Sequence, residues 1–363
     1  MSEEAETKVA ASSFSNEIPI SKFLINHSIK LESLLNGESY SYFSDVPTST
    51  SKTINETIRN SSFSYSSCDL DGDLSSPAYV LGVDEAGRGP VLGPMVYGAF
   101  YLPVSLSDFL LRKTHQFDDS KNLTHTVRSD LMRKVCTEGT DLYEHCGWAV
   151  EVMSARDISS NMMKPGVSYN LNAQAMDATI GLINQIHNKG VNLKEIYIDT
   201  IGKPETYQKK LEAIFPNIKI TVSKKADSLF PCVSAASVCA KVTRDAALEL
   251  LYENYLKEKE LGEDFVQSEI AEDSWGSGYP SDVKCSTWLR KNMHPLFGWG
   301  SECRFSWATA KDMLDQRNQA VKVDWPVDED EARHLTQYFS SKNDKDTDEL
   351  YNWFGRPVNS SFI

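Results

Sequence analysis

Apolar residues along the chain follow two kinds of spacing, one typical of strands and one of helices. Runs of apolar, extended-favouring residues predict buried strands at residues 79–83, 95–102, 147–153, 195–199 and 218–222. Stretches with apolar residues every three or four positions predict helices over residues 169–186, 204–215 and 233–259. A further helix is expected after Thr124, a favourable N-cap. Its apolar face would carry Val127, Leu131 and Val135.

The order of these elements is strand, strand, strand, helix, strand, helix, strand, helix, which predicts an α/β fold. A three-stranded meander followed by right-handed crossovers gives a mixed five-stranded sheet with flanking helices. In such a sheet the first, fourth and fifth strands lie side by side and parallel, so their carboxyl ends converge. We expect this folded domain to span residues 77–320 and to include a helical C-terminal portion.

The two ends of the chain differ from the middle in composition. Residues 1–76 are rich in Ser, Thr and Asn and hold 11 acidic and 5 basic residues, which predicts an acidic, mostly disordered extension whose removal leaves the core stable. Within it, residues 18–35 show some helical spacing and are a candidate docking segment. Residues 321–363 form an acidic tail with aromatics, a candidate partner-docking segment unless its apolar side chains pack on this chain's own core. These side chains are Trp325, Leu335, Tyr338, Phe339, Trp353 and Phe354.

Bulk composition narrows the class of protein. The net charge of −14 argues at first against nucleic-acid binding, but the middle of the chain is close to neutral. This middle part includes a cluster of basic residues, which is either a local nucleic-acid-binding face or an ordinary solvated surface. The cluster consists of Lys203, Lys209, Lys210, Lys224, Lys225, Lys241 and Arg244. No apolar run is long enough to span a membrane. Seven scattered cysteines without zinc-site spacing, and an acidic N-terminus without signal-peptide features, indicate an intracellular, reduced protein.

The strongest chemical signal lies in residues 79–94, YVLGVDEAGRGPVLGP. Asp84 and Glu85 end a buried strand, where carboxylates are costly to desolvate unless a cation is present. Mg²⁺ prefers a few carboxylates and keeps part of its water. The glycines that follow let the backbone come close to a ligand, and Arg88 can pair with a phosphate. The stretch therefore indicates a metal and a phosphodiester, with a simple hairpin turn as the alternative.

Two further acids lie at strand ends that should converge on the same cleft. Asp199 ends the fourth strand, and Asp227 follows the fifth. Taken singly, Asp199 is equally explained as a strand-end cap and Asp227 as a turn residue. Four carboxylates in one cleft need divalent cations to remain ionised together. The set matches two-metal phosphodiester chemistry.

The sequence resembles the type 2 ribonucleases H, the ribonuclease HII family, through motifs that occur in order between residues 78 and 315. These are DEAGRGP at 84–90, DSK at 119–121, SYNLN at 168–172, IDTIG at 198–202, KAD at 225–227, SAASVCAKVTRD at 234–245, GSGYPSD at 276–282 and RFSW at 304–307. PETY at 204–207 and RFSW resemble the catalytic A subunits of the eukaryotic enzymes. The long N-terminal segment and the tail after about residue 320 depart from the family pattern.

The resemblance implies a ribonuclease H-like fold and two Mg²⁺ or Mn²⁺ ions held by Asp84, Glu85, Asp199 and Asp227. It implies an endoribonuclease that cleaves the RNA strand of RNA–DNA hybrids and incises 5′ of single ribonucleotides embedded in duplex DNA. One ion would activate water and the other would stabilise the leaving oxygen, giving 3′-hydroxyl and 5′-phosphate ends. It also implies a nuclear, replication-linked role in ribonucleotide removal, with two non-catalytic partner subunits, B and C.

Substrate contacts are expected from the family motifs. Gly87, Arg88, Gly89 and Tyr279 are expected to read the 2′-hydroxyl and the junction with DNA. The remaining candidates for substrate or acid contacts are Lys121, Asn170, Lys225, Lys241 and Arg244. Alternatives are another metal-dependent nuclease, a type 1 ribonuclease H with the same fold, and a catalytically inactive scaffold that binds hybrids or partners.

Overall fold

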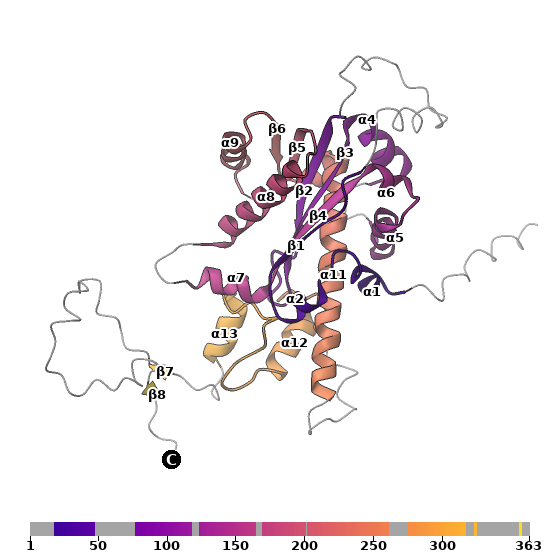
Figure 1. Cartoon of the computed structure of the whole chain (residues 1–363). Helices are drawn as coiled ribbons and strands as arrows, with labels where there is room; N and C mark the ends of the chain where they lie inside the picture. Colours follow the sequence, from indigo (N-terminus) through magenta and orange to yellow (C-terminus); the bar gives the residue numbers. More distant parts are fainter. Residues whose placement is uncertain are drawn as a thin grey trace, which may run out of the picture.

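The fold is built on a mixed sheet that, in the residues described, has six strands in the order β1-β4-β3-β2-β5-β6 (Figure 1). The computed structural model describes residues 18–47, 77–117, 123–164, 169–200, 202–260, 274–316, 323–324 and 356–357. The strands are β1 (Tyr40–Phe43), β2 (Tyr79–Ala86), β3 (Met95–Pro103), β4 (Gly147–Met153), β5 (Leu193–Asp199) and β6 (Lys219–Ser223). Neighbours from β1 to β2 are antiparallel, whereas β2, β5 and β6 are parallel. The predicted strands and their parallel trio are confirmed.

The expected count of five strands is wrong, because β1 adds a sixth from the N-terminal segment. It pairs antiparallel with β4, with Tyr40 opposite Val152 and Phe43 opposite Ala149. β1 is only four residues long and only Tyr40 in it is buried. Four residues are too few for an alternating apolar pattern to stand out in the sequence. The strand β4, which supplies the hydrogen bonds of β1 at this sheet edge, lies over a hundred residues away.

The segment before β1 is also ordered, so the prediction of disorder is wrong for residues 18–47. Helices α1 (Ile20–Leu24) and α2 (Leu31–Leu35) lie beside the long helix α11 (Pro231–Glu260), as Figure 1 shows in indigo and orange. Ile20, Leu24 and Leu34 join the core on that side. Ser28 Oγ lies 3.1 Å from Thr243 Oγ1 of α11. The candidate docking segment therefore docks on its own domain; residues 1–17 and 48–76 lie outside the described residues.

Helices cover both faces of the sheet. On one face lie α7 (Ala155–Met162), α8 (Leu171–Asn188) and α9 (Pro204–Ile214); on the other lie η1 (Ser107–Thr114), α5 (His125–Cys136) and α11. Along β2 the core alternates accordingly, because Leu81 and Val83 face α8 while Val80 faces α11. Gly82 lets α11 approach, since a Cβ there would lie 2.2 Å from the Cys232 carbonyl carbon. Short helices are α4 (Val104–Leu106), α6 (Asp141–His145) and α10 (Ala226–Leu229).

The predicted helices are present with ends shifted by a few residues. Thr124 caps α5 as expected, with Oγ1 accepting from the Val127 amide at 3.3 Å. Val127 itself is 42% exposed, so the apolar face of α5 is formed by Leu131 and Val135 without it. The expected positions of α8, α9 and α11 are confirmed.

The helical C-terminal portion is confirmed as α12 (Val283–Lys291) and α13 (Ala308–Gln316). A third cluster of buried residues joins this part to the loop after β2 through Leu92 and to α11 through Leu248. Strands β7 (Val323–Asp324) and β8 (Arg356–Pro357) pair with each other. The tail aromatics proposed for partner docking lie outside the described residues. In the described parts of the chain, no helix is long and apolar enough to cross a membrane.

Candidate active site

The converging ends of β2, β5 and β6 carry the four predicted carboxylates. Asp84 and Glu85 lie at the end of β2, which pairs in parallel with β5 up to Val83 and Ile198. Asp199 is the last residue of β5, and its Oδ1 accepts from the Ala226 amide at 3.0 Å. That bond ties β5 to the first turn of α10, where Asp227 is 4% exposed. The sheet register therefore brings together acids that are far apart in the sequence.

Burial and mutual repulsion make these acids hard to ionise. Burial raises the pKa of Asp84 to about 7; the Asp199 carboxylate adds to the rise, while Ser237 and Lys241 oppose it. Burial likewise raises the pKa of Glu85 to about 8, with Asp84 and Asp199 contributing and Arg88 opposing. These shifts mark a site where negative charges are gathered without full compensation.

The donor set fits a hard divalent cation. Its ligand atoms are carboxylate oxygens only, which suit Mg²⁺ or Mn²⁺. Asp84, Glu85 and Asp199 are electrostatically coupled, and a cation between them would relieve the repulsion that raises their pKa values. Within the described residues, no three acidic, His or Cys side chains already lie at metal-ligand spacing.

The glycine-rich turn after β2 is held by a buried arginine from the far end of the domain. Arg304 is fully buried and donates to the carbonyls of Gly87 (2.7 Å), Arg88 (3.0 Å) and Gly93 (3.0 Å). Trp307 Nε1 donates to the Gly89 carbonyl at 3.0 Å. Arg304 and Trp307 belong to the RFSW motif, and their role at this turn follows only from these contacts.

Tyr279 stands over the same turn. It is 38% exposed, and a Cβ on Gly89 would come within 3.1 Å of its ring. The Arg244 guanidinium lies 5.7 Å from the centre of that ring and donates to the Ser277 carbonyl at 2.6 Å. Arg244 is 5% exposed and also donates to Asp245. It therefore supports the loop that carries Tyr279, rather than presenting a free charge.

The other predicted contacts fall in different places. Lys241 lies on α11 next to the acids and donates to Ser237 Oγ at 2.8 Å. Lys225 is exposed, in a left-handed backbone conformation (φ 57°) at the turn into α10. Asn170 caps α8 through the amides of Asn172 and Ala173, and Asn172, two residues on, receives a hydrogen bond from Arg88. Lys121 lies outside the described residues.

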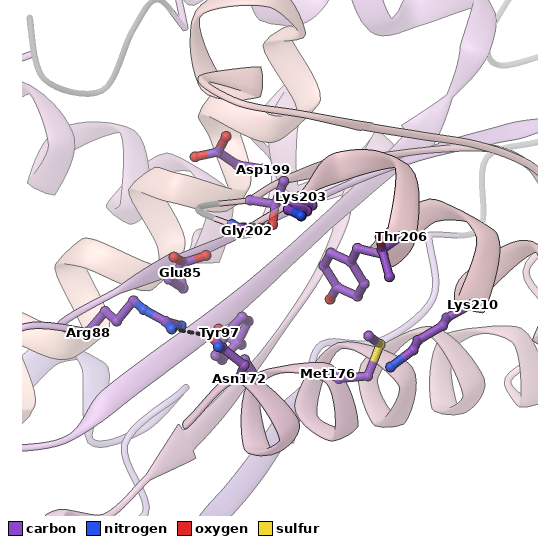
Figure 2. Close-up of a pocket in the computed structure, with 13 residues that line it drawn as sticks. Glu85, Arg88, Tyr97, Asn172, Met176, Asp199, Gly202, Lys203, Thr206 and Lys210 are labelled. Atoms are coloured by element: carbon purple, nitrogen blue, oxygen red, sulfur yellow. Dashed lines mark hydrogen bonds between the residues drawn. The ribbon is translucent and has the colours of Figure 1, made fainter. Parts of the chain in front are cut away.

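A cavity of about 250 Å³ opens beside the carboxylates, between α8 and α9 (Figure 2). Glu85, Arg88 and Asp199 line its inner end, and Asn172 faces Arg88 across it. Asn172 belongs to the SYNLN motif, but the sequence pattern alone does not indicate it as a site residue. The remaining lining residues are Tyr97, Ala175, Met176, Thr200, Gly202, Lys203, Thr206, Tyr207 and Lys210.

Comparison with known proteins identifies the family. The family model described as Ribonuclease HII matches residues 81–310. The chain belongs to the ribonuclease HII family. It is 57% identical to the A subunit of ribonuclease H2 from Neurospora crassa, over 77% of this chain and 84% of that protein. The corresponding A subunits from Schizosaccharomyces pombe (44%; 80% and 83% covered) and Homo sapiens (43%; 72% and 81% covered) are also similar.

A solved archaeal structure shares the fold. The PCNA:RNase HII complex from Archaeoglobus fulgidus matches with a TM-score of 0.50 and 25% identity, over 64% of this chain and 96% of that one. The resemblance noted in the sequence, including that to eukaryotic A subunits, is confirmed. The chain is a ribonuclease of the H type, an endonuclease, and the names of its relatives mark them as subunits of larger assemblies.

Proposed function

We propose that this chain is the catalytic subunit of a heterotrimeric ribonuclease H that cuts the RNA strand of RNA–DNA hybrids and incises 5′ of single ribonucleotides in duplex DNA. The observation that carries the proposal is the gathering of Asp84, Glu85 and Asp199 at one cleft, with pKa values of about 7 and 8 for the first two. Like charges are gathered in this way where a cation is part of the site. Family membership supplies the reaction class.

Asp84, Glu85, Asp199 and Asp227 would hold two Mg²⁺ or Mn²⁺ ions. When bound, such ions supply Lewis-acid stabilisation of the attacking and leaving oxygens, which gives 3′-hydroxyl and 5′-phosphate ends. The chain's own residues keep the acids in place: the Glu85 amide donates to Asp84 Oδ1 at 2.8 Å, and the Ser228 amide donates to Asp227 Oδ1 at 3.1 Å. Lys241 offsets part of the negative charge beside Asp84.

The turn after β2 is proposed to recognise the ribose. Gly87 and Gly89 lack side chains, so their peptide groups can approach a 2′-hydroxyl closely. Tyr279, over Gly89, offers a ring that stacks on a sugar or base and a hydroxyl that binds the 2′-oxygen. Arg88, fixed by Asn172, lies at the edge of the cavity to pair with a phosphate. We assign Lys121 and Lys225 to contacts with the nucleic-acid backbone.

The B and C partner subunits and a nuclear role in ribonucleotide removal belong to the same proposal. They are supported by the names of the relatives, which are subunits.

The test is cleavage of a duplex with one ribonucleotide by the chain reconstituted with its B and C partners. Asp84→Asn or Asp199→Asn should abolish Mg²⁺-dependent cleavage while circular dichroism and assembly stay unchanged, because a lost carboxylate weakens the metal site. Near wild-type turnover in either variant would overturn the assignment. A wild-type complex that binds hybrids without cutting them would favour the inactive scaffold, and 2′,3′-cyclic phosphate ends would point to attack by the 2′-hydroxyl.

A further inference from the structure

The cavity beside the carboxylates extends past them along α9. Figure 2 shows Glu85 and Arg88 at one end and Lys210 at the other, with Lys203 and Thr206 between them. Met176 of α8 and Tyr207 of α9 also line this cavity and pack against the hydrophobic core below. The extension therefore has an apolar floor and a polar side, and it opens directly from the acids.

Helical spacing decides which side chains of α9 and its N-cap, Lys203, face the cavity. Thr206, Tyr207 and Lys210 follow Lys203 by three, four and seven positions, which places all four along one side of the helix. Lys209, next to Lys210 in the sequence, is exposed and does not line the cavity. The capped helix thus carries two lysines directed to the cavity and one directed elsewhere.

The acids of the cavity, Glu85 and Asp199, lie with Arg88 at its inner end, whereas its two lysines lie along the α9 side. Lys203 and Lys210 are exposed, and neither forms an ion pair with an acid that the structure describes. Glu205 and Glu212 of α9 are absent from the lining. Two unmatched ammonium groups at the mouth of an active site suit a polyanion that runs through it.

We propose that Lys203 and Lys210 bind two backbone phosphates of the strand that is cut, on one side of the scissile bond. This inference rests on the proposed function and extends its substrate footprint. Seven residues of helix rise about 10 Å, so the two ammonium groups are far enough apart to contact separate phosphates of one strand. Thr206, between them on the same face, donates a hydrogen bond to the intervening backbone. These contacts position the strand without reading its sequence.

The experiment measures binding separately from cleavage. Fluorescence anisotropy is recorded without divalent cations, from 50 to 200 mM KCl, with the full chain assembled with its partner subunits and a labelled duplex containing one ribonucleotide. Each lost phosphate contact flattens the slope of log affinity against log salt by about 0.9. Over this range the wild type should therefore lose about tenfold more affinity than Lys203→Gln/Lys210→Gln. Lys209→Gln, the matched control on the same helix, should keep the wild-type slope.

Duplex length locates the contact. Shortening the duplex stepwise from one end should erase the difference between wild type and double variant, whereas shortening from the other end should not. The proposal is overturned if the double variant keeps the wild-type slope, if Lys209→Gln flattens it as much, or if the difference survives shortening from both ends. Absence of cleavage by the wild type would overturn the proposed function instead; the binding slopes test the lysines in either case.

Discussion

Removing the Arg304 guanidinium tests whether the recognition turn is held from the C-terminal part of the domain. In Arg304→Met the carbonyls of Gly87, Arg88 and Gly93 lose a charged donor at 2.7–3.0 Å. Three such bonds stabilise by about 4.5 kcal/mol at the lower end of their usual range. Burial lowers the pKa of Arg304 to about 9, a sign that the buried charge is itself costly. Its removal offsets part of the loss, so we expect a net loss of about 3 kcal/mol.

In a domain of this size such a loss lowers Tm by about 6 to 12 °C, measurable by calorimetry. Displacement of the turn by about 1 Å should also lower kcat/KM by about 100-fold at temperatures where the variant is folded. Arg304→Lys keeps the charge but not the planar guanidinium. Its Tm and kcat/KM should therefore lie between those of the wild type and those of Arg304→Met.

The matched control is Arg290→Met in the last turn of α12, where the side chain is exposed and the change should stay within about 0.5 kcal/mol. Unchanged stability in Arg304→Met would refute the energetic argument. Reduced stability with an unchanged kcat/KM would show that Arg304 supports the fold without positioning the turn.

Three further perturbations test other parts of the structure. Deleting residues 1–47 should lower Tm by at least about 5 °C, because five apolar side chains between Ile20 and Tyr40 are removed from the core. Deleting residues 1–17 removes none of these side chains and is the control; an equal Tm for the two truncations contradicts the prediction. Without metal, unfolding stability should fall as pH rises from about 5 to 8.5, since the raised pKa values of Asp84 and Glu85 let the folded state bind more protons than the unfolded state. Mg²⁺ should restore this stability at the upper end of the pH range and have little effect at the lower end. Stability that does not change with pH, or a pH dependence that is the same in Asp84→Asn, argues against a link between these carboxyl groups and folding. Tyr279→Phe should cost on the order of 1 kcal/mol in kcat/KM, and Tyr279→Ala more on single ribonucleotides than on long hybrids; an equal loss on both substrates assigns Tyr279 to holding the site together.

The sequence alone predicted five of the six strands of the central sheet, its parallel trio, and the strand ends at which the four acids lie. Local signals sufficed for the strands, because β2, β3 and β4 are nearly continuous buried apolar runs and β5 and β6 alternate between buried and less buried residues. The acids could be placed in one cleft because parallel neighbouring strands end at the same edge. The motif wording then indicated a family that comparison confirmed.

Only the tertiary structure decided the contacts between segments that are far apart in the chain. β1 is a strand because β4 supplies its hydrogen bonds, over a hundred residues away, and not because of its own pattern. The polar, Ser-rich composition of residues 1–76 hid the few apolar side chains that pack on α11. Asn172 and Asn170 have the same chemistry two positions apart, and only the direction of α8 sets Asn172 against Arg88 while Asn170 caps the helix. Arg304 reaches Gly87 across 217 residues of sequence, a partnership that no local spacing encodes. Periodicity reports which face of an element is buried, whereas the partner across that face is fixed only when the chain folds.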